Sequence, residues 1–123
     1  MEKSEFIYEA ELLRVIDGDT VEFLVDVGFD MFTKQKFRLL AIDTPEVFGV
    51  KKGSEEYALG KLASAFTANW FVENGSHVVI QSFSAQRELR TGKYGRWLAY
   101  IYPQGESTEH LNGALLAAGH VKK

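Results

Sequence analysis

Apolar and polar residues alternate along the first third of the chain in three runs, and turn residues separate these runs. Alternation of this kind is typical of half-buried strands, and Asp17-Gly18-Asp19 and Gly28-Phe29-Asp30 are turn signals between them. The third run stops at Asp43-Thr44-Pro45, because proline cannot donate to a sheet ladder. The pattern therefore predicts three consecutive strands, over residues 6–15, 20–27 and 32–42.

After residue 53 the spacing of apolar residues changes to that of a helix. Ser54 is a favourable N-cap, and the two glutamates after it suit the positive end of a helix dipole. Asn74-Gly75 is a stop signal. We predict a helix between these points, with helical spacing carried by Tyr57, Leu62, Ala65, Phe66 and residues 69–70.

The rest of the chain predicts two more strands, over residues 77–83 and 96–102, and a short helix over 111–118 that Gly119 ends. The fold class we predict is mainly β with α: an OB-like barrel of five strands with two to three helices. A closed barrel removes the exposed edges that an open sheet would leave. An α+β sandwich fits the same order of elements.

With 123 residues and 46% apolar composition, the chain has the size of one compact domain, and we predict a single domain over 1–123. Its start contains no apolar stretch that could form a secretory core or a membrane span. We expect no membrane contact and a cytoplasmic or processed secreted form. The absence of cysteine excludes disulfides and thiolate metal sites.

The formal net charge of -3 argues against a protein that coats nucleic acid, because such binding depends on lysine and arginine. One segment, residues 86–96, is nevertheless basic. A solvated loop would explain such a run, and so would a phosphate-binding surface. Its basic residues are Arg87, Arg90, Lys93 and Arg96.

Two aspartates, Asp19 and Asp43, lie at the start of one predicted strand and the end of another, so strand pairing could bring them together. Oxygen ligands without histidine or cysteine suit calcium or magnesium rather than zinc. Asp-Gly-Asp is also an ordinary turn, and Asp-Thr-Pro an ordinary strand exit. The two residues alone therefore leave both readings open.

Several blocks, in order, show that the chain resembles the staphylococcal nuclease (thermonuclease) family, and the resemblance covers nearly its whole length. The blocks are Ile16-Asp17-Gly18-Asp19-Thr20-Val21, Phe37-Arg38-Leu39-Leu40-Ala41-Ile42-Asp43-Thr44-Pro45-Glu46, Arg90-Thr91-Gly92-Lys93-Tyr94-Gly95-Arg96-Trp97, and Leu111-Asn112 with Ala118-Gly119. The resemblance implies an SNase-like OB fold and a calcium-dependent endo- and exonuclease. Its substrates would be DNA and RNA, cut at the 5′ P–O bond to leave 3′-phosphates.

The resemblance also implies roles for single residues. Calcium is the implied cofactor, with magnesium the less favoured ion. The implied metal ligands are Asp19, Asp43 and the backbone carbonyl of Thr44, with Asp17 and Thr20 behind them. The implied catalytic residues are Arg38 and Arg96, which would hold the phosphate, and Glu46, which would act as the base for water. The implied substrate contacts are Lys93 and Tyr94.

The chain departs from the family pattern in two places. It stops at Lys123, before a pair of pocket tyrosines and a third helix, so we expect weaker nucleotide binding but intact metal chemistry. The turn after Val27 is longer than in the best-known member. Phe29 or Met31 could contact substrate there, and we expect them to close the barrel instead. The remaining large aromatics, including Trp70 and Phe71, are assigned to packing.

A noncatalytic nucleic-acid or protein interaction module is the alternative function, since domains of this fold occur without activity. Such domains usually lose carboxylates or arginines, whereas Asp19, Arg38, Asp43, Glu46 and Arg96 are all present. A small phosphate-ligand binder would not need Glu46. We expect a monomeric nuclease that prefers single-stranded or frayed DNA and RNA.

Overall fold

Five strands and two helices make up the part of the chain that the computed structural model describes, residues 5–83, 97–105 and 109–122. They are β1 (Glu5–Asp17), β2 (Thr20–Gly28), β3 (Met31–Leu39), α1 (Glu55–Asn74), β4 (His77–Phe83), β5 (Trp97–Pro103) and α2 (Leu111–Ala118). The order of elements is the one that the sequence pattern predicts.

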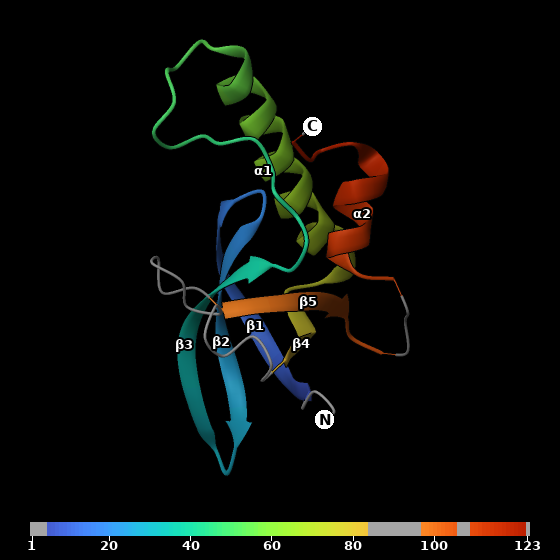
Figure 1. The fold of residues 1–123 in the computed structure, drawn as a ribbon. Coiled ribbons are helices and arrows are strands. Elements are labelled where there is room, and N and C mark those ends of the chain that lie inside the picture. Colours follow the sequence, from blue (N-terminus) through green and yellow to red (C-terminus); the bar gives the residue numbers. More distant parts are fainter. Residues whose placement is uncertain (1–4, 84–96, 106–108, 123) are drawn as a thin grey trace.

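The strands form a closed barrel in the order β1-β2-β3-β5-β4 (Figure 1). Strand β1 pairs antiparallel with both β2 and β4, and β3 pairs parallel with β5, with Phe37 opposite Trp97. The barrel closes where the last three residues of β3 pair with the start of β5. The predicted five-stranded barrel of the OB type is therefore confirmed.

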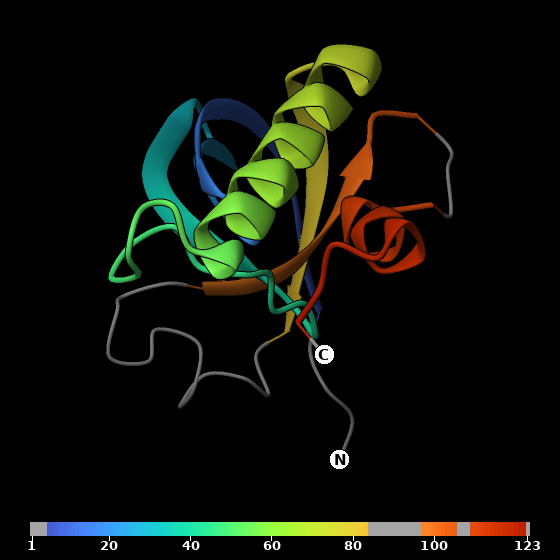
Figure 2. The same ribbon diagram turned by 90° about the horizontal axis from the view of Figure 1, so that it is seen from above.

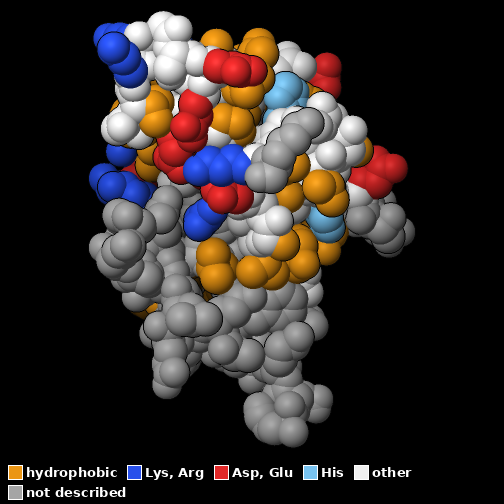
Figure 3. Space-filling model, turned by 45° about the horizontal axis from the view of Figure 1, so that its top comes forward, with side chains coloured by type: hydrophobic (Ala, Val, Ile, Leu, Met, Phe, Trp, Pro, Cys, Tyr) orange, Lys and Arg blue, Asp and Glu red, His pale blue; other side chains and the backbone are white. Residues whose placement is uncertain are grey.

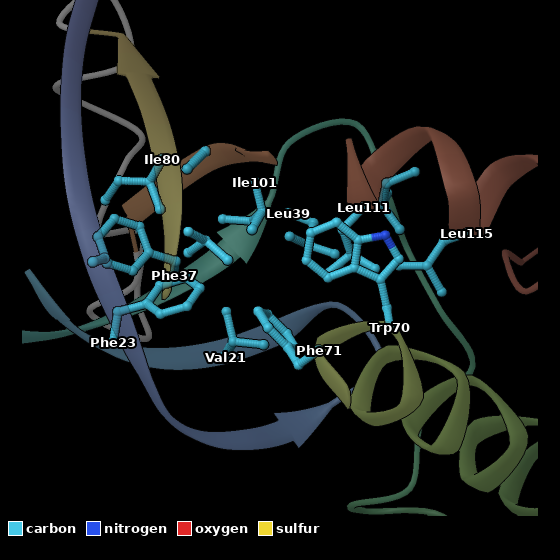
Figure 4. Close-up of a cluster of buried hydrophobic side chains, with 14 of the residues drawn as sticks. Val21, Phe23, Phe37, Leu39, Trp70, Phe71, Ile80, Ile101, Leu111 and Leu115 are labelled. Carbon is cyan, nitrogen blue, oxygen red and sulfur yellow. The ribbon is translucent and has the colours of Figure 1, made fainter. Parts of the chain in front are cut away.

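Both helices lie over one end of the barrel, with α1 crossing it and α2 beside α1 (Figures 1 and 2). Trp70 and Phe71 from α1 and Leu111 and Leu115 from α2 are buried in the cluster that also contains Phe23 (Figure 4). The Phe71 and Phe23 rings meet edge to face, with centroids 6.0 Å apart. The packing role predicted for Trp70 and Phe71 is confirmed. No helix in the described part of the chain is both long enough and apolar enough to cross a membrane.

The two ends of α1 are where the sequence predicts them, but its buried face is different. The Ser54 side chain accepts a hydrogen bond from Tyr57 N at 3.2 Å, and Gly75 follows the last turn with φ 93°. Leu62, predicted to share the apolar spacing, is 57% exposed, so that prediction is wrong. The first part of the buried face consists of small residues, which let the helix approach the barrel closely, and its end consists of two large aromatic side chains. The buried residues are Gly60, Ala63, Thr67, Trp70 and Phe71.

Strand β3 ends at Leu39 and not at residue 42 as predicted. Ala41 adopts φ 65°, a left-handed conformation that cannot continue an extended strand. Leu40 N still donates to Ala99 O at 2.9 Å, so the chain leaves the sheet just after this bond. The aspartate that follows, Asp43, therefore lies in a loop and not at a strand end.

The prediction that Phe29 or Met31 closes the barrel is wrong, because Phe29 is 96% exposed and Met31 58% exposed. Phe29 and Asp30 both have positive φ, 58° and 59°, as in the tight turns that match the twist of a two-strand hairpin. These residues form the tip of the β2–β3 hairpin, which extends away from the helices (Figure 1).

The Asn112 side chain links α2 to β5 and to the first residue after β3. Its Nδ2 donates to Leu40 O at 2.9 Å and to Ala99 O at 3.1 Å, and its Oδ1 accepts from Ile101 N at 3.2 Å. The side chain is buried, and its satisfied hydrogen bonds offset the cost of burying an amide. The start of the 40–54 loop is thereby held against β5 and α2.

Candidate functional site

One cavity of about 510 Å³ collects charged side chains from segments that are far apart in the sequence. The β1–β2 turn, the end of β3, the loop after β3 and the segment after α2 all contribute. Lys/Arg and Asp/Glu side chains lie interleaved on this face of the molecule (Figure 3). The lining residues are Ile16, Asp17, Asp19, Thr20, Lys36, Arg38, Asp43, Glu46, Phe48 and Lys122.

Asp19 is buried at the wall of this cavity and fixed by hydrogen bonds on both carboxylate oxygens. Oδ1 accepts from Thr20 Oγ1 at 2.9 Å, and Oδ2 accepts from Thr44 N at 3.0 Å. Its carbonyl also accepts from Leu39 N at 2.9 Å. These bonds join the β1–β2 turn to the loop after β3. Thr44 itself is buried behind the cavity and is not among its lining residues.

The turn that carries Asp19 is packed against α1 without room for another side chain. A Cβ on Gly18 would lie 2.8 Å from Ala63 Cβ and 2.9 Å from Thr44 Oγ1. Thr67 Oγ1 donates to Gly18 O at 2.7 Å. The helix therefore positions the turn. Because Gly18 has no Cβ, its backbone comes close enough to α1 to accept the hydrogen bond from the Thr67 hydroxyl.

Arg38 lies between the two aspartates. Its Nη2 donates to Asp43 Oδ1 at 2.9 Å, lies 3.6 Å from Asp19 Oδ2, and reaches Ile42 O at 3.4 Å. Within the described residues all of these contacts use Nη2, so Nε and Nη1 have no partner there. Donors of the planar guanidinium therefore remain available for an anion.

Glu46 is held through both its backbone and its side chain. Its N–H donates to Glu56 Oε2 at 3.3 Å, and its Oε2 lies 3.6 Å from Lys122 Nζ. Lys122 Nζ is also 3.7 Å from Glu56 Oε2, and Lys122 N donates to Asp43 O at 2.7 Å. The pKa of Lys122 is raised, chiefly by the charge of Asp43 and then by Glu46 and Glu56. The segment after α2 thus braces the loop that carries Asp43 and Glu46.

The structure brings Asp19, Arg38, Asp43 and Glu46 to one cavity. The predicted site residues Lys93, Tyr94 and Arg96 lie outside the described residues, as does the whole basic segment, residues 86–96.

Three residues that position the site were missed from the sequence: Glu56, Gly60 and Lys122. A glycine inside a predicted helix is a signal of close packing, and Gly60 carried that signal. Glu56 was assigned only to the helix dipole, and nothing in the sequence marked Lys122. Partners of this kind depend on tertiary packing.

The donor set of the cavity is oxygen, from four carboxylates, and no histidine lines it. This set fits a hard cation such as calcium or magnesium. Among the described residues, however, no three such side chains already converge on one point. Asp19 and Asp43 instead share the Arg38 guanidinium.

Asp17 lies next to Asp19 and has an unusual affinity for protons. Burial, with the neighbouring Asp19 second, raises its pKa from 3.8 to about 7. The folded protein therefore binds this proton more tightly than the unfolded chain does. The stabilisation that this protonation gives the folded state is complete below pH 3.8 and is lost as the pH rises through 7.

Replacing Asp17 with asparagine should stabilise the protein in chelator at pH 8, by about 1 to 2 kcal/mol after allowance for solvent screening. Well below pH 3.8 the two proteins should be equally stable, because the aspartate is then protonated in both states. Urea unfolding of both proteins across this range measures the difference. A difference independent of pH would contradict the assignment.

Comparison with known proteins places these segments in one family. Residues 36–122 match the family model of staphylococcal nuclease homologues. A thermonuclease of Staphylococcus hyicus is 33% identical over 93 residues, which cover 75% of this chain and 47% of that protein. An uncharacterized protein of Methanocaldococcus jannaschii is 30% identical over 129 residues, which cover 94% of this chain and 58% of that protein.

An uncharacterized protein of Bacillus anthracis is 31% identical over 112 residues, which cover 91% of this chain and 45% of that protein. The chain spans about half the length of the curated relatives it matches. The family match extends from β3 through α2 and includes the loop with Asp43 and Glu46. The chain therefore belongs to the family of staphylococcal nuclease homologues.

Proposed function

We propose that this chain is a calcium-dependent nuclease that hydrolyses phosphodiester bonds of DNA and RNA and leaves 3′-phosphates. The observation that carries the proposal is the single cavity in which Asp19, Asp43, Glu46 and the partly free guanidinium of Arg38 meet. A carboxylate that can take a proton and a cation that can hold a phosphate are the two side-chain functions that phosphodiester hydrolysis needs.

Asp19, Asp43 and the Thr44 carbonyl would hold the calcium ion. When bound, the ion supplies Lewis-acid stabilisation of the charge that develops on the phosphoryl oxygens. Asp19 is suited to this role because the bonds from Thr20 and Thr44 fix the orientation of its carboxylate. Asp43 would share its carboxylate between the ion and Arg38.

Arg38 would hold the scissile phosphate through the N–H groups that its contacts with the loop leave free, while Asp43 keeps Nη2 in place. Arginine suits this position because its planar fork binds two phosphate oxygens at once, and lysine offers only a point charge. Arg96 would hold the same phosphate from the other side and stabilise the departing 5′ oxygen. Lys93 and Tyr94 would contact the neighbouring 3′ phosphate.

Glu46 would accept the proton of the attacking water on Oε1, the oxygen without a partner among the described residues. Lys122 stays on Oε2 and keeps the carboxylate oriented. The water oxygen forms the new bond to phosphorus, the bond to the 5′ oxygen breaks, and that oxygen takes up a proton. The products are a 3′-phosphate and a 5′-hydroxyl.

Digestion of single-stranded DNA, duplex DNA and RNA should require calcium and stop in chelator. The reason is that chelation removes the ion that would supply Lewis-acid stabilisation of the phosphoryl charge. End-labelled substrates analysed on gels measure the rate, and phosphatase treatment identifies the 3′-phosphate. Magnesium should support less cutting. Binding of these substrates without any metal-dependent cutting would instead establish the noncatalytic interaction module.

A further inference from the structure

The outer face of β3 presents a row of cations that ends in the site. Along this strand Phe37 and Leu39 are buried in the barrel, whereas Lys34 and Lys36 are exposed and Arg38 is half-buried. Successive side chains of a strand point to opposite faces, so the three cations share one face. Lys36 and Arg38 line the same cavity, and Lys34 continues the row outside it.

The spacing of this row suits a nucleic-acid backbone. Residues two apart on a strand are separated by about 6.6 Å, so the three cations extend in a line over about 13 Å. Successive phosphates of an extended single strand have a similar separation. A duplex backbone curves around its axis and would leave such a straight row.

The two lysines carry charge that the neighbouring strand does not neutralise. Glu22 lies opposite Lys36 in the sheet, but its Oε1 pairs with Arg14 Nε at 2.9 Å. Leu24 lies opposite Lys34. Within the described residues neither lysine has an ion-pair partner. In a chain of net charge -3, this row is a local exception.

We propose that the outer face of β3 is a binding track for single-stranded nucleic acid, in which Lys36 and Lys34 contact the two phosphates beyond the one held by Arg38. The track rests on the proposed function, since Arg38 sets its position. Contacts to phosphates do not distinguish DNA from RNA, so both bind.

The track ends beyond Lys34, where the next charged neighbour is acidic. The next outward residue is Phe32, which is 57% exposed and lies opposite Asp26. An acidic neighbour disfavours a further phosphate there. The exposed ring instead offers a stacking surface to the last base, since aromatic stacking tolerates any base.

The test measures equilibrium binding in a Glu46→Gln background, in which the expected cutting is too slow to disturb the measurement. Replacing Lys34 and Lys36 with serine should weaken binding of a single-stranded octanucleotide about tenfold in calcium. The slope of log affinity against log salt should become shallower by about 1.4, since each lost single-strand phosphate contact contributes about 0.7. Binding of a nucleoside bisphosphate, which reaches Arg38 but neither of the two lysines, should not change. Fluorescence anisotropy provides both measurements.

A variant with both lysines changed to arginine is the matched control and should keep the affinity and the salt slope. An unchanged slope in the serine variant, or an equal loss for the bisphosphate and the octanucleotide, would overturn the track. Because binding is measured without cleavage, this result is independent of whether the wild-type protein cuts. If the wild-type protein does not cut but the serine variant shows the expected change in salt slope, the nuclease proposal is rejected and the track is retained.

Discussion

Replacing Glu46 with glutamine should lower kcat by about a thousandfold and leave calcium and nucleotide binding within a few-fold of wild type. The amide has the size of the carboxylate but cannot accept the proton of the attacking water. Its oxygen can still face Lys122, which also retains Glu56 as a partner at 3.7 Å. Single-turnover cleavage of a labelled oligonucleotide measures the chemical step, and calorimetry measures calcium binding.

Glu56→Gln is the matched control for this prediction, because Glu56 contacts the same lysine and lies beside Glu46. Its amide oxygen can still accept from Glu46 N, so the loop stays in place and the loss of activity should be less than tenfold. If both variants lose activity equally, Glu46 acts through the Lys122 network and is not the base. Wild-type activity in Glu46→Gln would show that Glu46 does not act as the base.

Replacing Gly60 with alanine should lower kcat/KM about a hundredfold and destabilise the protein by about 1 to 3 kcal/mol. A Cβ on Gly60 would lie 2.6 Å from Glu46 O and 2.8 Å from Pro45 O. Both obstacles are backbone atoms, so the loop that carries Glu46 must move away from α1. The gain from alanine in a helix, about 0.5 to 1 kcal/mol, offsets only part of this cost.

Gly113→Ala is the control for Gly60→Ala, since both glycines lie inside helices. At Gly113 the added Cβ would approach only the His110 ring, at 3.2 Å. We expect near-normal activity and a stability change of less than about 1 kcal/mol there. Urea unfolding and cleavage assays of both variants separate the two effects. Full activity of Gly60→Ala would show that the position of this loop is not critical.

Much of the fold could be predicted from the chain, because its elements carry local signals. The turn at Asp17-Gly18-Asp19, the Ser54 cap and the stops at Gly75 and Gly119 each depend on residues that are adjacent in sequence. The buried face of α1 could not be predicted in this way. Gly60, Ala63 and Thr67 are buried because the barrel lies against them, and their own hydrophobicity does not require it.

The candidate site shows the same division. Asp19, Arg38, Asp43 and Glu46 could be proposed together because their blocks match a known family in order. Their contacts could not: Asp43 pairs with Arg38, and Lys122 reaches Glu46 from the far end of the chain. The Lys122–Glu46 pair exists only after the barrel and α2 are in place, and the Arg38–Asp43 pair only after the chain leaves β3 through the left-handed Ala41.

The sequence by itself determined the strand and helix order, the oxygen-only donor set and the basic character of residues 86–96, because these depend on residue type and short-range periodicity. Only the tertiary structure decided that Arg38 bridges Asp19 and Asp43, that the segment after α2 braces Glu46, and that Lys34 and Lys36 line up toward the cavity. The physical reason is that charge pairing and desolvation depend on distances across the fold.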